Sequence, residues 1–226
     1  MNTFLVTGSG AGLGFAIVTR LRELNKTVYE FDRKLGHDVR VPWTTFGPPP
    51  ANLDCLINCA GVNLTGWLDE FSEASWDEVM DINAKGIFTM TKWAYQSLRE
   101  SKGTILNIVS NAATVPMTCS AAYNASKGAA LILTKQLARE LTKKNGITVF
   151  SVSPNKLAGT EMSRDIEEQV TKTRGWTAAF AAEYQRKSLL CGEETDPQVL
   201  ADFIAYLLSE KIRHKYLSGC DIPYGT

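Results

Sequence analysis

The sequence of 226 residues is long enough for a substantial core, and its 44% hydrophobic and 21% charged residues are typical of globular proteins. Its 24 basic residues balance its 24 acidic residues, which argues against nucleic acid as a partner. The five cysteines form no C-x-x-C pair, and no apolar run reaches the length of a membrane span or a signal peptide. We therefore expect a cytoplasmic protein with reduced thiols, no metal site and no membrane contact.

Short β-branched or apolar runs alternate along the chain with longer helical patterns. The runs expected to form strands are 4–6, 27–31, 55–57, 104–109 and 147–152, with a last strand after residue 219. The runs expected to form helices are 12–24, 72–80, 84–100, 123–144 and 196–209. This alternation predicts an α/β fold: a Rossmann-type, doubly wound, mostly parallel sheet flanked by helices. We expect one domain over residues 1–226.

The alternation is incomplete between residues 32 and 54. Only four residues separate Asp32 from the run 37–39, too few for a crossover helix. Pro42 and the prolines at 48–50 oppose a helix of normal length in the next stretch. We expect two helices on one face of the sheet to be shortened or missing, and the third strand to be rudimentary.

The run TGSGAGLG, residues 7–14, lies between the first strand and the first helix. Glycine lets the backbone approach a pyrophosphate closely, and free N–H groups at a helix start favour an anion. A glycine-rich run alone is weak evidence, but this position is the one that dinucleotide binding requires.

Asp32 ends the second expected strand, eighteen residues beyond Gly14. A carboxylate there accepts hydrogen bonds from the adenosine ribose and repels a 2′-phosphate. Arg33 would instead pair with such a phosphate. The sequence favours NAD(H) over NADP(H).

Tyr123 and Lys127 are four residues apart in the long helical run, so they share one helical face. The pair alone is close to a chance event, and an exposed helix turn is the alternative interpretation. Its weight comes from the other motifs and their spacing.

Those motifs, in order, resemble the classical short-chain dehydrogenase/reductase family over nearly the whole chain. The family's Thr-Gly-x-x-x-Gly-x-Gly matches residues 7–14, and its Asn-x-Ala-Gly matches residues 58–61. The resemblance implies a compact member whose catalytic residues are Asn83, Ser110, Tyr123 and Lys127. The cofactor-binding residues that the glycine loop and the resemblance imply are Gly8, Ser9, Gly10, Gly12, Leu13, Gly14, Asp32, Asp38, Val39, Asn58, Ala60, Gly61, Tyr123, Lys127, Pro154 and Thr160.

The reaction implied is hydride transfer between a nicotinamide and a carbonyl or secondary alcohol, as in dehydrogenases acting on CH–OH groups. Tyr123 would act as general acid/base, because a nearby ammonium and an oxidised nicotinamide favour phenolate; lowering its pKa by about three units corresponds to roughly 4 kcal/mol. Ser110 would hydrogen-bond the substrate oxygen. By the same resemblance, Asn83 would hold a water that relays protons to Lys127.

Two details depart from the family pattern near the fifth expected strand. Asn155 follows Pro154 where the family usually has glycine, and we expect asparagine to preserve the turn because it tolerates positive φ. Thr160 lies six residues after Pro154, where five is commoner.

Residues 160–192 are expected to form a lid over the substrate. Trp176, Phe180 and Tyr184 recur every fourth residue, a stripe expected to pack this lid onto the body. The run 111–122, expected to line the pocket, holds no charged residue, which indicates an uncharged substrate. Sugar derivatives, ketosteroids, pteridines and quinones all remain open.

The resemblance also implies a homodimer or homotetramer, formed through the helices at 84–100 and 123–144. The alternative from another functional class is a catalytically silent NAD(H)-binding sensor or scaffold of the same fold. A sugar-nucleotide epimerase would need a further domain. A serine hydrolase would need a Ser–His pair, and this sequence offers no plausible one.

Overall fold

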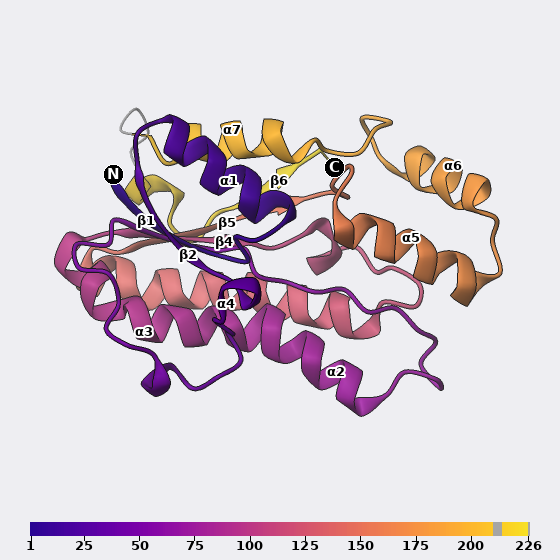
Figure 1. Cartoon of the computed structure of the whole chain (residues 1–226), viewed down its shortest axis with the longest axis horizontal. Helices are drawn as coiled ribbons and strands as arrows, with labels where there is room; N and C mark the ends of the chain where they lie inside the picture. The colour runs from indigo at the N-terminus through magenta and orange to yellow at the C-terminus, as the bar shows by residue number, and fades with distance from the viewer. Residues whose placement is uncertain (210–213, 226) are drawn as a thin grey trace.

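Six parallel strands form one sheet in the computed structural model of the chain, which describes residues 1–209 and 214–225 (Figure 1). The strands are β1 Thr3–Thr7, β2 Thr27–Phe31, β3 Cys55–Asn58, β4 Thr104–Ile108, β5 Thr148–Pro154 and β6 Asp221–Tyr224. Their order across the sheet is β2-β1-β3-β4-β5-β6. The chain turns from β1 to one side and then crosses to β3 on the other. Ligands of such sheets bind at this reversal, beyond the carboxyl ends of the strands.

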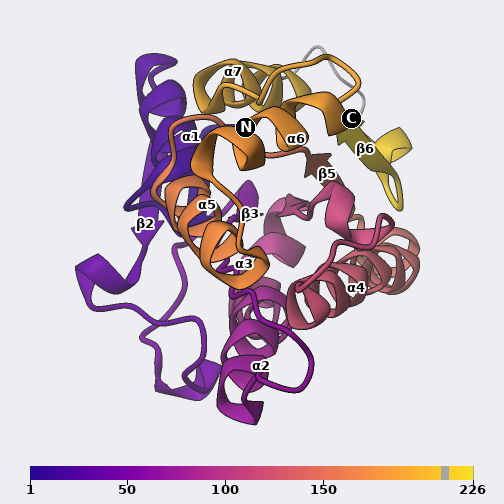
Figure 2. The ribbon, with the colours of Figure 1, turned by 90° about the vertical axis from the view of Figure 1, so that its right-hand side faces the viewer.

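Helices cover both faces of the sheet, as the alternating pattern predicts. They are α1 Gly12–Glu23, α2 Glu73–Met80, α3 Gly86–Ser101, α4 Ala121–Asn145, α5 Glu161–Arg174, α6 Ala178–Ser188 and α7 Pro197–Leu207. In Figure 1, α1 and α7 lie above the sheet, and α3 and α4 lie below it. Figure 2 views the molecule from the right-hand side of Figure 1 and shows α5 and α6 in front of the sheet.

The central strands are buried because helices cover them on both sides. Every residue of β3, β4 and β5 is buried, whereas the outer strands β2 and β6 are partly exposed. The sequence prediction of a doubly wound Rossmann-type sheet is therefore confirmed.

The helices expected to be short are reduced to single turns between β2 and β3. Residues 32–54 hold two short 3-10 turns, Arg33–Leu35 and Trp43–Thr45, and form no strand. The rudimentary strand that we expected within residues 32–54 does not form, and β2 is the edge of the sheet.

An aromatic cluster covers the sheet where the crossover helix is missing. His37 stacks on Phe31 with ring centroids 4.9 Å apart, and Phe46 and Trp93 lie 5.1 and 5.8 Å from the Phe31 ring. Phe31 is buried as a result, although it ends an edge strand. His37, which no acid/base motif explained, has a packing role here.

Hydrogen bonds fasten the 32–54 segment to α3. The Trp93 indole N–H donates to the carbonyl of Gly47 at 2.7 Å. The Ser97 hydroxyl donates to the carbonyl of Pro50 at 2.6 Å and accepts from the Leu53 N–H. The segment is therefore held in place without a helix of its own.

Within the described residues, every helix is too short or too polar to cross a lipid bilayer. All five cysteines are free thiols.

Candidate active site

The glycine-rich run ends β1 and opens α1 as a tight turn. Gly8 and Gly12 have φ of +66° and +52°, conformations that residues with a Cβ rarely adopt. A Cβ at Gly14 would lie 2.0 Å from the Gly8 carbonyl oxygen, and one at Gly8 would lie 2.7 Å from Ala60 Cα. The turn therefore needs glycine and brings the end of β1 against the end of β3.

The start of α1 fits the phosphates of a dinucleotide. Ala11, which has no side-chain oxygen to cap the helix, precedes it. The first N–H groups of α1 thus lack a side-chain acceptor at this end, an arrangement that suits a pyrophosphate. The Ser9 hydroxyl is buried and has no hydrogen-bond partner among the described residues. Leu13 packs its side chain into the core beneath the loop.

Asp32 lies at the end of β2, beside the glycine loop. Its Oδ2 accepts a hydrogen bond from Gly10 N at 3.0 Å, and its Oδ1 accepts one from Lys34 N at 2.8 Å. A Cβ at Gly10 would lie 2.7 Å from Oδ1, so a larger residue there would displace the carboxylate. Each oxygen retains a further lone pair, which suits the two hydroxyls of a ribose.

Asp38 and Val39 lie farther along the same segment. Arg40 Nε donates to both Asp38 oxygens at 3.0 Å, and Arg40 Nη2 lies 2.6 Å from Oδ2. The Arg40 guanidinium therefore holds the pKa of Asp38 below its usual value. Val39 is buried, and a Cβ on Gly86 would lie 3.0 Å from it. The Asp38 carboxylate is thus held in place by Arg40.

The end of β3 is held by buried polar contacts. The Thr7 hydroxyl accepts from the N–H groups of Cys59 and Ala60 at 3.0 and 3.1 Å. Asn58, predicted to bind cofactor, donates to Asn107 Oδ1 at 2.8 Å inside the sheet, and its own side-chain oxygen is buried without a partner among the described residues. The Asn58 amide therefore links β3 to β4, while its oxygen retains room for a further donor.

Asn83 lies in a π-helical turn, Asp81–Lys85, between α2 and α3. Such turns occur frequently at functional sites. Its side-chain oxygen accepts from Val62 N at 2.8 Å, and its amide donates to the Val62 carbonyl and to Ser126 Oγ. Both amide hydrogens are therefore engaged by the protein.

Gly61 lies between Asn83 and Lys127. A Cβ on Gly61 would lie 3.4 Å from Asn83 Oδ1 and 3.7 Å from Lys127 Nζ. The absence of a side chain at Gly61 keeps open the space in front of the lysine. Residues predicted from three separate motifs thus meet in one place.

Ser110 and Tyr123 meet at the carboxyl end of β4. Ser110 follows the strand, and Tyr123 lies in the first turn of α4. Burial raises the pKa of the Tyr123 phenol, and a hydrogen bond with Ser110 acts in the opposite direction. The two hydroxyl groups therefore form a pair in a largely dry environment, where a phenol remains protonated at neutral pH.

Lys127 lies beneath Tyr123 on the same face of α4. Its Nζ donates to the Ile108 carbonyl at 3.1 Å and lies 5.7 Å from the centre of the Tyr123 ring. Burial lowers the pKa of Lys127 to about 8, with a nearby Cys59 acting in the opposite direction. The ammonium is thus close to the phenol, and no carboxylate in the described part of the chain pairs with it.

Thr160 lies across the glycine loop. It caps α5 by accepting a hydrogen bond from Ser163 N at 3.1 Å, and its methyl group would lie 3.5 Å from a Cβ on Gly12. The shift of one residue relative to the family pattern therefore still leaves Thr160 beside the loop. Pro154, the other predicted contact of this segment, ends β5.

The expectation for Asn155 is wrong. Its φ is not positive, in contrast to asparagines 25 and 52. Its side chain acts instead: Asn155 Nδ2 donates to the Gly225 carbonyl, and the Thr195 hydroxyl donates to Asn155 Oδ1 at 2.5 Å. Asparagine thus links the end of β5 to two distant segments.

The aromatic stripe also differs from the prediction. Trp176 lies 5.0 and 4.9 Å from the rings of Phe180 and Tyr184, and the latter two are each 52% exposed. The stripe packs on itself rather than onto the body of the protein.

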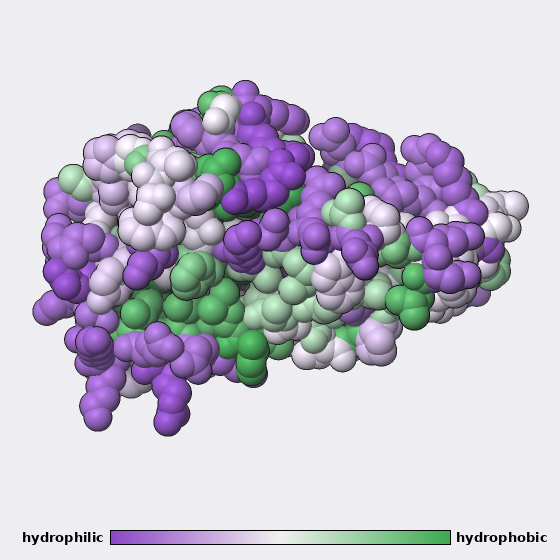
Figure 3. Space-filling model, turned by 90° about the horizontal axis from the view of Figure 1, so that it is seen from below, coloured by the Kyte–Doolittle hydropathy of each residue, from purple (hydrophilic) through white to green (hydrophobic). Residues whose placement is uncertain are grey.

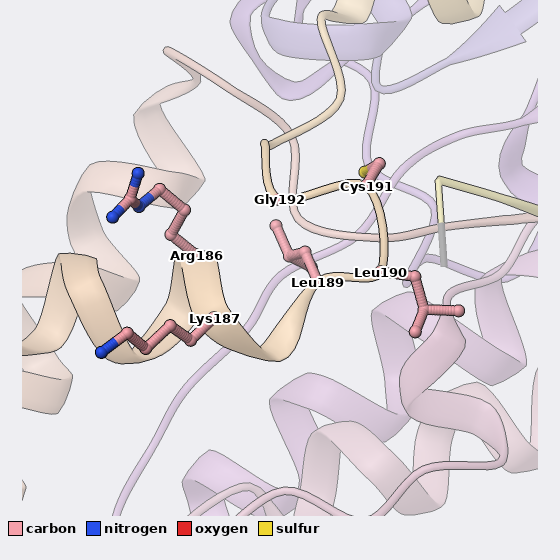
Figure 4. A pocket seen from close by; sticks show the side chains of 6 residues that line it. All are labelled: Arg186, Lys187, Leu189, Leu190, Cys191 and Gly192. Atoms are coloured by element: carbon pink, nitrogen blue, oxygen red, sulfur yellow. The ribbon is translucent and has the colours of Figure 1, made fainter.

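A hollow of about 340 Å³ lies at the end of α6 (Figure 4). Its lining residues are Arg186, Lys187, Leu189, Leu190, Cys191 and Gly192. All six lie within the predicted lid, and none is one of the predicted catalytic or cofactor-binding residues. Both cations pair with Glu183.

Comparisons with known proteins agree with this arrangement. A family model for short chain dehydrogenases matches residues 50–171. Human (3R)-3-hydroxyacyl-CoA dehydrogenase is 30% identical, over 96% of this chain and 92% of its own length. The chain belongs to the short chain dehydrogenase family. This family of oxidoreductases is the one that the motifs predicted.

Solved structures of the family show the same fold. NAD⁺-bound xylitol dehydrogenase superposes with a TM-score of 0.87 at 24% identity, covering 100% of this chain and 98% of its own. An actinorhodin polyketide ketoreductase with NADPH has a TM-score of 0.80 at 23% identity, covering 98% and 95%. Members with this fold thus bind either nicotinamide dinucleotide.

Two residues escaped the sequence prediction. Thr7 was treated as part of the glycine motif, but its hydroxyl holds the turn after β3. A polar residue ending a buried strand was the available signal. Arg40 fixes Asp38, and a cation two residues from a predicted contact was a weaker signal.

Proposed function

We propose that the protein reduces an uncharged carbonyl compound with a nicotinamide cofactor, and catalyses the reverse oxidation of the alcohol. One observation carries the proposal: Ser110, Tyr123 and Lys127 converge at the carboxyl end of β4. The bound nicotinamide supplies the hydride in this chemistry. The glycine loop and Asp32 support its binding.

The raised pKa of Tyr123 keeps the phenol protonated at neutral pH, which is the state that reduction of a carbonyl requires. A protonated phenol can donate its proton to the carbonyl oxygen as negative charge develops there. The Ser110 hydroxyl would donate a hydrogen bond to the same oxygen and stabilise that charge. The Lys127 ammonium would then favour the phenolate that is left behind.

Asn83 is proposed to act through position. Because its amide hydrogens are engaged by Val62 and Ser126, it holds the 61–62 turn open in front of Lys127. A proton-relaying water, which the family resemblance assigned to Asn83, would have to contact a group of Asn83 other than these amide hydrogens, which are already donated.

We further propose NAD(H) as the preferred cofactor, since the fixed Asp32 carboxylate would repel a 2′-phosphate. Residues 160–192 would form the substrate lid of a single domain, because α5 begins beside the glycine loop. Free thiols are compatible with the proposed cytoplasmic location.

A screen of diverse ketones, following oxidation of NADH and NADPH at 340 nm, tests the proposal. We expect turnover with at least one ketone, faster with NADH. Tyr123→Phe should lower kcat by about 10²–10⁴-fold, the usual effect of removing a general acid, while fluorescence titration shows that NADH still binds. Near-wild-type turnover in this variant would refute the role of Tyr123. NADH binding without turnover across the panel would instead favour the silent sensor.

A further inference from the structure

The far end of α5 touches a loop that follows β3. The Thr65 N–H and hydroxyl both donate to Gln169 Oε1, at 2.9 and 3.1 Å. The Trp67 indole N–H donates to the Thr173 carbonyl at 3.0 Å. These residues are more than 100 positions apart in sequence, so the contacts close the lid onto the body.

Arg174, the last residue of α5, makes a second connection. Its Nη2 donates to the Thr118 carbonyl at 2.6 Å, and its guanidinium lies 4.8 Å from the Trp176 ring centre. The next residue after Thr118, Cys119, accepts from Gly66 N through its carbonyl at 2.9 Å. Three segments thus form a ring of hydrogen bonds beyond the catalytic group.

Hydrogen bonds of Asn124 hold the loop that Arg174 contacts in place beside Tyr123. Asn124 follows Tyr123, and its Nδ2 donates to the carbonyls of Ala112 and Val115 at 2.6 and 2.8 Å. Asn124 Oδ1 also accepts from Met117 N at 3.2 Å. These hydrogen bonds fix the position of the loop relative to Tyr123. A contact between Arg174 and this loop therefore closes the lid on the side where the substrate would bind.

The segments that flank the lid, around residues 156–157 and 194–195, are held more strongly than the far end of α5; we call these two segments the root of the lid. Leu157 and Thr195 form a bridge between its two ends. Lys156 pairs with Glu167 at 2.5 Å and with Glu194 at 2.7 Å, and only 14% of the lysine side chain is exposed. A motion of the lid would therefore pivot at this root.

The closure at the far end has little apolar support. Within α5, only Ser163 and Val170 are buried. Cys119 has φ of +64°, which is unfavourable for a residue with a side chain. The buried Arg174 Nε has no acceptor among the described residues, and such a donor reduces the net gain of the contact. Closures that must open are drawn from weakly held parts of a structure.

We propose that Arg174 is a positioning residue that holds the lid closed over the substrate and thereby limits substrate size. The inference rests on the proposed function of the site. Among the contacts of the described residues, the Arg174 side chain alone joins α5 to the loop that Asn124 holds beside Tyr123. This contact carries a charge. A guanidinium contact is stronger than the neutral hydrogen bonds beside it.

Hydrogen exchange by mass spectrometry tests the closure without requiring turnover. In Arg174→Ala, amides of residues 161–188 should exchange about ten-fold faster, the effect of losing one charge-assisted hydrogen bond, while β4 and β5 keep their protection. Arg174→Lys should restore part of the protection. The matched control is Lys172→Ala on the same helix, which removes an exposed ion pair with Glu168 and should change exchange by less than about two-fold.

Kinetics with the ketone found by the screen give a second readout. Arg174→Ala should raise KM for that ketone several-fold with kcat changed less than about two-fold, because the chemical groups are intact. For the same variant, an analogue of that ketone enlarged by a phenyl group should gain in kcat/KM relative to the ketone itself. Wild-type exchange rates in Arg174→Ala, or equal loss of protection in β4 and β5, would overturn the proposal. If the ketone screen fails while Arg174→Ala still exchanges faster over residues 161–188, the proposed function fails and the closure by Arg174 stands.

Discussion

Lys127 is a cation held in a nearly dry site, and its cost to the fold can be measured. A pKa near 8, compared with 10.5 for an ordinary lysine, corresponds to about 3 kcal/mol of lost stability at neutral pH. Lys127→Met removes this cost but also removes the hydrogen bond to the Ile108 carbonyl, which is worth about 1 kcal/mol. The variant should therefore be more stable by about 2 kcal/mol at pH 7 while turnover is abolished. Denaturant unfolding between pH 7 and pH 10 measures the difference.

The sign of the pH dependence follows from the direction of that pKa. Because the folded pKa is lower, the unfolded chain binds more protons between about pH 8 and 10.5, and wild-type stability rises relative to the variant across this window. The advantage of Lys127→Met should thus shrink as the pH increases. Lys135→Met, an exposed position on the same helix, is the control. A Lys127→Met protein that is less stable than wild type at pH 7 would contradict the argument.

The sequence predicted the positions of residues correctly where those positions depend on one local pattern. Tyr123 and Lys127 share a helical face because of their four-residue spacing, and Asp32 directly follows β2 and accepts a hydrogen bond from Gly10 of the glycine loop. Asn155 was misjudged, since its partners Thr195 and Gly225 lie 40 and 70 residues away. A backbone preference could be inferred from one residue, but a long-range side-chain contact could not.

At the scale of elements, the segment from 32 to 54 shows how a lost helix is replaced. Trp93 on α3 packs edge-on against Phe46 and donates its indole N–H to Gly47. Trp93→Ala should lower the free energy of unfolding by about 3 kcal/mol, the lower end for removal of a packed aromatic ring. NADH affinity should fall as well, because the same segment carries Asp32 and Asp38.

Two substitutions separate the causes of that loss. Trp93→Phe keeps the ring and removes the indole hydrogen bond, so we expect a cost of about 1 kcal/mol. Trp43→Ala changes an aromatic residue of the same segment that is already 39% exposed, and it should have a smaller effect than Trp93→Ala. Chemical denaturation and NADH fluorescence titration give the two readouts. Equal stability of Trp93→Ala and wild type would show that the cluster does not hold the segment.

The elements themselves followed from periodicity and punctuation wherever those signals were strong. All six strands and the helices of the body lie within a few residues of their predicted positions. The proline-rich segment lacked any period, so its shortening could be predicted but its aromatic covering could not. Phe46 and Trp93 are 47 residues apart, and only the folded sheet brings them together.

At the scale of the whole molecule, one face remains to be explained. Seen from below, the surface formed by α2, α3 and α4 carries an apolar area between hydrophilic margins (Figure 3). Phe88 on α3 is 52% exposed and Ile132 on α4 is 66% exposed. Exposed apolar areas of this kind mark interaction surfaces. The homodimer or homotetramer expected from the sequence would use these same two helices.

Ile132→Glu tests whether this face joins copies of the chain. A carboxylate buried at such an interface would lack a partner, so the variant should dissociate toward a species of 24.9 kDa. Sedimentation velocity of both proteins at equal concentration measures the change. Leu190→Glu places the same charge at a residue that is 87% exposed on the lid and should leave the assembly intact. If wild-type protein already sediments as a single chain, the apolar face serves another purpose. If both variants dissociate, added charge rather than this face is responsible.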